Sequence, residues 1–301
     1  MKRDLLTLLD LNREEILHIL EEASRLKGLQ KRGIPHQILL GKTIAMVFEK
    51  PSTRTRVSFE VGIAQLGAVP VVLHAGEMQL GRGETVEDTA HVLSRYVDGI
   101  MIRAYSHSAV EALAKAASVP VINGLTDYTH PCQILSDLFT IYELRGFVEG
   151  MTVAYIGDGN NVAHSWILAA SKLDFTLKLG CPKGYEPDRE VMEKVPEGHV
   201  QIFNDPGEAM AGADVVYTDV WTSMGQEEEA QRRLNDFEGF QVTPTLMSLA
   251  REGAWFMHCL PAHRGQEVAA EVIDGPQSIV IVQAENRLHA QKAILAFLLS
   301  K

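Results

Sequence analysis

Short apolar runs alternate with longer amphipathic stretches along the whole chain. The runs have the length of β-strands, and they recur in two blocks that are separated near the middle of the sequence. They are residues 43–48, 69–73, 99–102 and 119–123 in the first block, and 151–158, 175–182, 200–205, 213–219, 254–261 and 278–286 in the second. Strands that alternate with helices are typical of βαβ units. The pattern predicts an α/β fold with two parallel-sheet domains of similar size.

A longer helix-like segment, residues 130–150, lies between the two blocks. Pro131 stands at a position typical of a helix start, apolar side chains follow at helical spacing, and Gly146 and Gly150 end the pattern. We therefore expect a helix that bridges the two domains.

The glycines that end this helical pattern also predict the boundary between the domains. We expect one domain at residues 1–148 and a second at residues 149–286. The final amphipathic stretch could pack on either half of the chain by its pattern alone. We expect residues 287–301 to form a C-terminal helix that packs back on the first domain.

The composition of the chain disfavours nucleic-acid-binding, membrane-spanning and zinc-cluster proteins. The chain has 301 residues, 46% of them hydrophobic, and its formal net charge of -11 disfavours binding to nucleic acid or to an anionic membrane. Three cysteines without a Cys-x-x-Cys pair predict reduced thiols and no zinc cluster. No apolar run approaches the ~18 residues of a membrane span, and charges interrupt the N-terminal runs before they reach signal-peptide length. We therefore expect a cytoplasmic protein.

The sequence Ser-Thr-Arg-Thr-Arg, residues 52–56, begins a helix-like stretch shortly after the first strand-like run. Ser and Thr are common N-cap residues, so plain capping is one interpretation. Arg54 and Arg56, however, oppose the positive end of the helix dipole. A bound anion would reverse that penalty, because backbone N–H groups, hydroxyls and a guanidinium would all point at it. The stretch therefore favours a phosphate-type ligand over capping alone.

Further polar side chains stand at the ends of other strand-like runs. Arg103 follows one run and Arg287 follows the last, although a lone arginine at such a place is more often a surface charge. His130 could donate to a carbonyl oxygen as it develops charge, and Gln133 could bond an amide. A helix cap with an exposed histidine is the alternative there. Because ligands collect at the carboxyl ends of parallel strands, these residues together predict one anion-handling site.

Residues 157–162, Gly-Asp-Gly-Asn-Asn-Val, invite a dinucleotide-binding interpretation. Val162 replaces the third glycine of that motif, and the next run ends at Cys181 rather than at an acid for a ribose. The dinucleotide signal is therefore weak. Asn160 and Asn161 instead offer amides that could orient a zwitterion, or could cap a helix, and we expect one role for each.

A later cluster offers groups for an amino-acid ligand. Asp219 ends a strand-like run and could bind a substrate ammonium group, while capping is the alternative. Ser223 and the backbone of Met224 could bind a carboxylate or the same ammonium group.

Cys259 leaves the following run beside His258, His263 and Arg264, in surroundings that could lower the pKa of a thiol. A buried structural cysteine is the usual alternative. The Cys-Leu-Pro sequence predicts that the chain turns into a loop here. That loop would expose the carbonyl groups of Cys259 and Leu260 to a ligand amine.

Four motifs in one order span essentially the whole chain. They are Ser-Thr-Arg-Thr-Arg at 52–56, His-Pro-Cys-Gln at 130–133, Asp-Val-Trp-Thr-Ser-Met-Gly at 219–225 and His-Cys-Leu-Pro-Ala-His-Arg-Gly at 258–265. Together they resemble the ornithine carbamoyltransferases of the aspartate/ornithine carbamoyltransferase family. Aspartate carbamoyltransferases share the first two motifs but not the last two.

The resemblance implies that the first domain binds carbamoyl phosphate and the second binds ornithine. It implies transfer of a carbamoyl group from carbamoyl phosphate to the side-chain amine of L-ornithine, which gives L-citrulline and phosphate. The reaction could run in this direction for arginine biosynthesis or in the reverse direction for arginine catabolism. No metal or other cofactor is expected, because arginines and helix N-termini can supply the positive field that the reaction needs.

The resemblance also implies which residues act. The carbamoyl-phosphate site would comprise Ser52, Thr53, Arg54, Thr55, Gln79, Arg103, His130, Gln133, Cys259, Leu260 and Arg287. The ornithine site would comprise Asn161, Asp219, Ser223 and Met224. Of these, the catalytic residues would be Arg103, His130, Cys259 and Arg287. The family forms catalytic trimers, so we expect a homotrimer or a multiple of trimers in which Gln79 completes the phosphate site of a neighbouring subunit.

Three alternatives stay open at this point. A carbamoyltransferase for putrescine or N-acetylornithine is the nearest, although putrescine has no carboxylate and an acetylated amine cannot pair with Asp219. An NAD-dependent dehydrogenase would fit the two α/β halves, but the missing third glycine counts against it. A non-catalytic anion-binding protein would not need Cys259 and His130 on the same rim.

Overall fold

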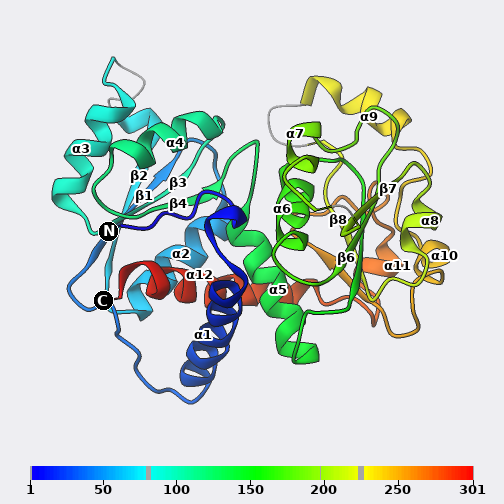
Figure 1. Cartoon of the computed structure of the whole chain (residues 1–301), viewed down its shortest axis with the longest axis horizontal. Coiled ribbons are helices and arrows are strands. Elements are labelled where there is room, and N and C mark those ends of the chain that lie inside the picture. Colours follow the sequence, from blue (N-terminus) through cyan, green and yellow to red (C-terminus); the bar gives the residue numbers. More distant parts are fainter. Residues whose placement is uncertain (1, 79–82, 197, 223–226, 301) are drawn as a thin grey trace. The chain divides into compact units, whose positions relative to one another are not determined.

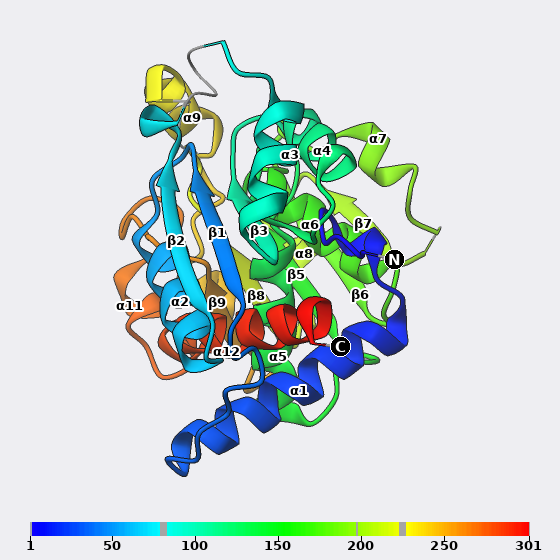
Figure 2. The same ribbon diagram turned by 90° about the vertical axis from the view of Figure 1, so that its left-hand side faces the viewer.

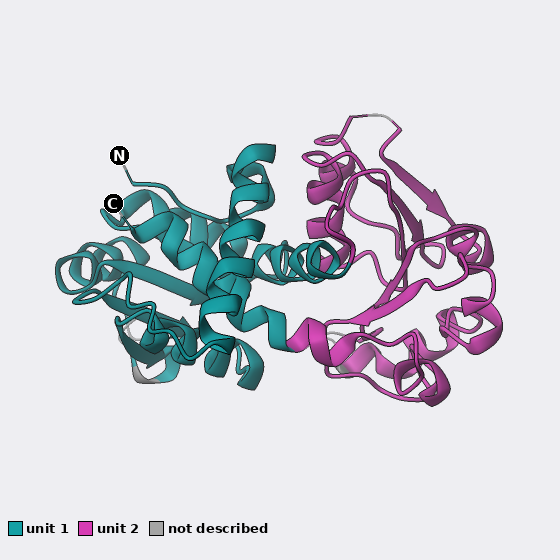
Figure 3. Cartoon of the chain, turned by 90° about the horizontal axis from the view of Figure 1, so that it is seen from below, with its two compact units in different colours: residues 1–144, 285–301 teal, residues 145–284 magenta. Residues whose placement is uncertain are grey.

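The structure, a computed structural model, describes residues 2–78, 83–196, 198–222 and 227–300. The chain divides into unit 1, residues 1–144 with 285–301, and unit 2, residues 145–284 (Figure 3). The division along the chain falls at the end of a long helix, Pro131–Arg145. The C-terminal segment returns to unit 1.

Unit 1 holds a four-stranded sheet in the order β2-β1-β3-β4, and all pairs are parallel (Figure 1). Its strands are β1 (Thr43–Phe48), β2 (Val69–His74), β3 (Gly99–Arg103) and β4 (Val121–Leu125). Its helices are η1 (Leu8–Asp10), α1 (Arg13–Lys31), α2 (Thr53–Gln65), η2 (Ala75–Glu77), α3 (Val86–Tyr96), α4 (His107–Ala116), α5 (Pro131–Arg145) and most of α12 (Val280–Leu299).

Helices cover the sheet of unit 1 because its strands are apolar on both faces. On one face, Ala90 of α3 and Leu113 of α4 belong to the same buried cluster as Val47 and Ile100 of the sheet (Figure 2). The opposite face carries α2 and α12 (Figure 1). This layering leaves the carboxyl ends of the strands to carry the loops with polar residues.

Unit 2 holds a five-stranded parallel sheet in the order β7-β6-β5-β8-β9. Its strands are β5 (Thr152–Ile156), β6 (Thr176–Gly180), β7 (Val200–Phe203), β8 (Val215–Thr218) and β9 (Trp255–His258). Its helices are α6 (Asn161–Ala170), α7 (Arg189–Met192), α8 (Pro206–Met210), η4 (Glu227–Glu229), α9 (Ala230–Asp236), α10 (Pro244–Met247) and α11 (Ala270–Ile273). The predicted fold of two parallel-sheet α/β halves is confirmed.

One predicted strand is wrong. Residues 278–286, which the apolar pattern predicts as the last strand, instead begin α12 (Val280–Leu299). The burial pattern explains the difference, because Val280, Gln283 and Asn286 are buried while Ile281 is 74% exposed. Buried positions three apart are typical of a helix and not of a strand. Arg287 therefore lies inside a helix rather than after a strand.

The C-terminal helix packs on unit 1, as predicted. Lys292 of α12 is fully buried, and its Nζ donates to Gln30 Oε1 at 2.7 Å and to Gln65 Oε1 at 3.0 Å. Gly62 of α2 permits the close approach of the two helices, since a Cβ there would lie 3.2 Å from Lys292 Cγ. None of the described helices combines the length and hydrophobicity needed to cross a membrane.

His289 of α12 is also buried. Burial and, to a smaller extent, the ammonium groups of Lys292 and Lys27 together lower its pKa to about 3. An imidazole in an unfolded chain has a pKa of about 6.5. Between pH 6.5 and pH 3 the unfolded chain therefore binds a proton that the folded chain does not, and acid favours unfolding in this window.

We predict that the free energy of unfolding falls as the pH is lowered from 6.5 towards 3, and that His289→Gln reduces this slope by up to about 1.4 kcal/mol per pH unit. Urea unfolding at a series of pH values measures it. His91→Gln, which changes an exposed histidine of α3, is the control and should keep the original slope. Equal slopes for the wild type and His289→Gln would contradict the prediction.

Candidate active site

The N-terminus of α2 combines a helix cap with a cation. Ser52 is the N-cap, and its Oγ accepts a hydrogen bond from Thr55 N at 3.2 Å. Arg54 follows in the first turn, and its Nε atom is buried without a hydrogen-bond partner among the described residues. Arg56 differs, because it is exposed and pairs with Glu60 at 3.4 Å. Of the two arginines that oppose the helix dipole, only Arg56 forms an ion pair one turn along the helix.

Three further side chains gather near the start of α2, at the carboxyl ends of the strands of unit 1. Arg103 ends β3, and its register partner is Phe48 at the end of β1, so it lies beside the connection into α2. Arg287 of α12 reaches the same place, since its Nη2 donates to Thr55 Oγ1 at 2.8 Å. His130 lies directly before α5, and it is 4% exposed. The structure thus brings Arg103, His130 and Arg287 together, as the sequence predicts.

The charge state of His130 follows from these neighbours. Burial lowers the pKa of His130 well below its ordinary value, and the Arg287 and Arg103 guanidinium groups lower it further. The imidazole is therefore neutral near pH 7. A neutral imidazole among arginines can donate one N–H to a ligand oxygen without adding another positive charge.

Gln133 is oriented by a residue that the sequence analysis missed. Its Nε2 donates to Asp137 Oδ1 at 2.9 Å, one turn further along α5, and both side chains are buried. The Gln133 Oε1 atom is buried and has no hydrogen-bond partner in the described part of the chain. The amide therefore presents an acceptor. The spacing of four residues between an amide and a carboxylate on one helix was the signal that could have identified Asp137.

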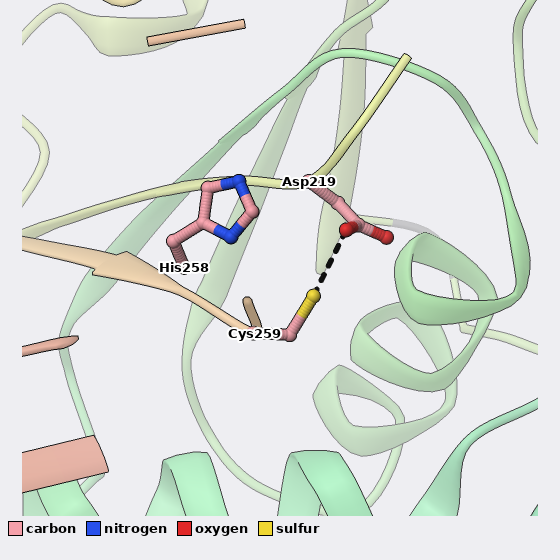
Figure 4. Close-up of side chains that lie close together, drawn as sticks. All are labelled: Asp219, His258 and Cys259. Atoms are coloured by element: carbon pink, nitrogen blue, oxygen red, sulfur yellow. Dashed lines mark hydrogen bonds between the residues drawn. The ribbon is translucent and has the colours of Figure 1, made fainter. Parts of the chain in front are cut away.

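Unit 2 gathers a second set of side chains at the carboxyl ends of β5, β8 and β9. Asp219 follows β8 and is 7% exposed. Asn160 follows β5, and its Nδ2 donates to Asp219 Oδ2 at 3.0 Å. Cys259 follows β9, and its thiol donates to Asp219 Oδ1 at 2.9 Å (Figure 4). One buried carboxylate thus connects three loops, and it is the group best suited to bind an ammonium ion there.

Asn160 is the asparagine that bonds Asp219, and it also caps a helix. Its Oδ1 accepts from Val162 N and Ala163 N at 2.9 and 3.2 Å, so it is the N-cap of α6. Asn161 is the first residue of α6 and is half-buried. The expectation of one capping and one ligand-binding asparagine therefore assigns the cap to Asn160.

The surroundings of Cys259 differ from those that the sequence predicts. Arg264 does not face the thiol, because it pairs with Asp274 at 2.6 and 2.8 Å. The thiol instead donates a hydrogen bond to the Asp219 carboxylate. Proximity in the sequence was misleading here, because the Leu260-Pro261 turn carries the following residues away from the strand end.

His258 holds the loop that contains Cys259. Its Nδ1 accepts from Leu260 N at 2.9 Å, and its Nε2 lies 3.2 Å from Glu267 Oε1 (Figure 4 shows the ring beside Cys259). Leu260 has a φ of 57°, a left-handed conformation that costs energy for a residue with a side chain. Both ring nitrogens of His258 are thus engaged within the protein, which positions the backbone after Cys259.

The Gly-Asp-Gly segment also has a structural explanation. A Cβ on Gly159 would lie 2.3 Å from Pro187 N, so the loop after β5 needs glycine to pass the backbone of residues 186–187. This explains the second glycine of the dinucleotide-like motif without a dinucleotide. Three residues with predicted roles, Gln79, Ser223 and Met224, lie outside the described residues.

The geometry therefore defines one cluster of polar side chains in each unit. Unit 1 gathers cations, a neutral histidine and an amide acceptor, which suit an anion that carries an N–H group. Unit 2 gathers a buried carboxylate, an amide and a thiol, which suit a cationic amine. Sites of this kind are typical of enzymes that transfer a group from an anionic donor to an amine.

Comparison with known proteins identifies the family. Residues 3–143 match the domain described as "Aspartate/ornithine carbamoyltransferase, carbamoyl-P binding domain". Residues 149–298 match "Aspartate/ornithine carbamoyltransferase, Asp/Orn binding domain". The chain belongs to the aspartate/ornithine carbamoyltransferase family, and the prediction from the four motifs is confirmed.

Relatives match over nearly the whole chain. An ornithine carbamoyltransferase of Pyrococcus abyssi is 56% identical, and the alignment covers 99% of this chain and 96% of the relative. The solved structure of ornithine carbamoyltransferase from Pyrococcus furiosus has a TM-score of 0.96 and 55% identity, and covers 99% of this chain and 97% of that one. The structure from Thermus thermophilus has a TM-score of 0.90 and 42% identity over 99% of both chains.

The contact between Asn160 and Asp219 yields a prediction. Asp and Asn are equivalent as N-caps, so Asn160→Asp would be neutral if capping were the only role. We instead predict a loss of about 1–3 kcal/mol in the free energy of unfolding at pH 7, because a new carboxylate would face that of Asp219. Chemical denaturation measures this loss.

The control is Asp205→Asn, which changes the N-cap of α8 in the same unit and should be nearly neutral. The loss at Asn160→Asp should shrink as the pH falls below about 4, where carboxylates become protonated. If Asn160→Asp were as neutral as its control, the contact with Asp219 would not contribute to stability.

Proposed function

We propose that this chain transfers the carbamoyl group of carbamoyl phosphate to the side-chain amine of L-ornithine, which gives L-citrulline and phosphate. The observation that carries the proposal is the match to a relative named ornithine carbamoyltransferase at 56% identity over 99% of the chain. Another relative, from Pyrococcus furiosus, is named ornithine carbamoyltransferase, anabolic, and is 55% identical. That name supports a role in arginine biosynthesis.

Unit 1 supplies the donor site in this proposal. Ser52, Thr53 and Thr55 stand at the start of α2, where backbone N–H groups and hydroxyls can bind a phosphate. Arg54 would form a charge-assisted hydrogen bond with the same phosphate. Arg103 would bind both the phosphate and the carbonyl oxygen. These groups would stabilise the negative charge that moves onto the phosphate as it leaves.

The carbamoyl group would be held by three residues. Neutral His130 would donate to the carbonyl oxygen, and Arg287 would assist it, so that the carbon becomes more electrophilic. Gln133 would accept a hydrogen bond from the carbamoyl amide, because Asp137 already holds the other end of its side chain. A new C–N bond then forms as the C–O bond to the phosphate breaks.

Unit 2 supplies the acceptor site. Asp219 would bind an ammonium group of ornithine, and Asn161, Ser223 and Met224 would bind the rest of its amino-acid end. The backbone carbonyls of Cys259 and Leu260 would face the reacting amine. That amine has a reference pKa of about 10.4, so it must lose a proton before it attacks. The Cys259 thiol donates to Asp219, so it could take that proton only after passing its own to the carboxylate.

The experiment that tests the function supplies purified protein with carbamoyl phosphate and one of four acceptors, namely L-ornithine, putrescine, N-acetylornithine or L-aspartate. We predict citrulline from ornithine and at least about a hundredfold lower rate with the other three, since each lacks a group that the site would bind. Product detection by mass spectrometry measures the carbamoylated amine. A preference for putrescine or N-acetylornithine would contradict the proposed acceptor, and reduction of NAD in a parallel sample that contains it would indicate a dehydrogenase instead.

We also propose a cytoplasmic trimer or a multiple of trimers. Support comes from valines that are exposed on α2 and β2, next to each other in unit 1, where β2 is an edge strand. They are Val57, Val61, Val69 and Val71, which are 38–57% exposed. Exposed apolar side chains beside an open sheet edge are typical of a surface that a partner covers. Sedimentation equilibrium should give the mass of three chains or a multiple of three, and a monomer would contradict the proposal.

A further inference from the structure

A buried arginine outside the predicted site connects two of its loops. Arg233 of α9 is 6% exposed, and its Nη1 donates to Asp158 Oδ2 at 2.8 Å and to the Trp221 carbonyl at 2.9 Å. Its Nε donates to Glu229 Oε2 at 3.2 Å, and the guanidinium lies 5.0 Å from the centre of the Tyr185 ring. A buried guanidinium that bonds two carboxylates and a carbonyl fixes the positions of these groups.

The two loops that Arg233 joins are the ones that carry the proposed acceptor site of unit 2. Asp158 stands two residues before Asn160 in the loop after β5. Trp221 stands two residues after Asp219 in the loop after β8. Asn160 and Asp219 themselves bond at 3.0 Å. The two loops are therefore joined at two places. Arg233 bridges them between Asp158 and Trp221, and the hydrogen bond between Asn160 and Asp219 bridges them two residues away in each loop.

The charges around Arg233 make it hard to replace. Burial raises the pKa of Asp158, the Arg233 guanidinium opposes that rise, and the net pKa is about 6. The arginine thus helps to keep the carboxylate ionised at neutral pH. Removal of one partner from a buried ion pair leaves the other charge without compensation, and the loops that carry it would then rearrange. A lysine would keep the charge, but its side chain is one atom shorter and lacks the Nε donor, so it could not hold Asp158, the Trp221 carbonyl and Glu229 together.

We propose that Arg233 is a positioning residue for the amine acceptor, because it holds the loops after β5 and β8 at the spacing at which Asn160 bonds Asp219. This inference rests on the proposed function for the identity of the acceptor. It makes Arg233 and Asp158 determinants of acceptor affinity although neither is among the residues expected to touch substrate. The donor site, which is built from unit 1, should be unaffected.

The test compares Arg233→Lys, Asp158→Asn and the double variant with wild type. We predict that each single variant raises the KM for L-ornithine at least about tenfold, as expected for loss of a charge-assisted hydrogen bond, and changes the KM for carbamoyl phosphate less than twofold. The double variant should raise the ornithine KM no more than the worse single variant, because both changes break one interaction.

The matched control is Arg251→Lys. Arg251 forms another close Arg–Asp pair of unit 2, with Asp214, which directly precedes β8 at the opposite end of that strand. It should keep both KM values, even where its unfolding temperature falls as much as that of Arg233→Lys. An unchanged ornithine KM in Arg233→Lys, or an equal rise of both KM values, would overturn the proposal.

A second measurement does not depend on activity. Hydrogen exchange of the backbone amides at residues 157–161 and 219–222 should become faster in Arg233→Lys and stay the same in Arg251→Lys. If the wild type forms no citrulline, the proposed function fails, but the exchange data still decide whether Arg233 holds the two loops. Unchanged exchange at both loops in Arg233→Lys would overturn the positioning role itself.

Discussion

The hydrogen bond from Arg287 Nη2 to Thr55 Oγ1 is the interaction on which the proposed donor site of unit 1 depends. It is 2.8 Å long and joins residues that are 232 positions apart in the chain. It exists because α12 returns to unit 1 and packs on α2, where Gly62 allows the close approach and buried Lys292 bonds two neighbouring helices. The same packing brings Arg287 close enough to His130 to lower its pKa. The last helix therefore completes a site that the first 144 residues begin.

The two units hold opposite charges at their strand ends. Unit 1 gathers the guanidinium groups of Arg54, Arg103 and Arg287, whereas unit 2 gathers the carboxylates of Asp158 and Asp219. Burying charge is costly unless each group is paired or hydrogen-bonded, and Arg233 and Asn160 meet that need in unit 2. A donor that leaves as phosphate and an acceptor that arrives as an ammonium ion fit these two environments.

Much of the fold could be predicted from the sequence because the strands are short apolar runs. The last run was the exception, since residues 278–286 have high β-propensity but begin α12, and Val280 packs in the buried cluster of unit 2. Contacts between distant residues decided that outcome, and local pattern does not contain them.

The candidate site was less accessible to sequence reasoning. The motifs identified residues at strand ends, and the structure brings Arg103, His130 and Arg287 together as expected. The motifs could not show three contacts between residues that come from different motifs or from none. These are the ion pair of Arg264 with Asp274, the hydrogen bond of Asn160 with Asp219, and the hydrogen bond of Gln133 with Asp137. Arg233 was missed because a single arginine on a charged helix has the pattern of a solvated surface.

We propose that the cations of unit 1 form a phosphate site, and the binding of carbamoyl phosphate, measured by isothermal titration calorimetry, tests this proposal most directly. Arg54→Gln should weaken binding at least about tenfold, because it removes a charge-assisted hydrogen bond to the phosphate. Arg56→Gln, two residues along the same helix, should change binding less than about threefold, because Arg56 pairs with Glu60. Equal affinities for wild type and Arg54→Gln, or an equal loss in both variants, would contradict the claim.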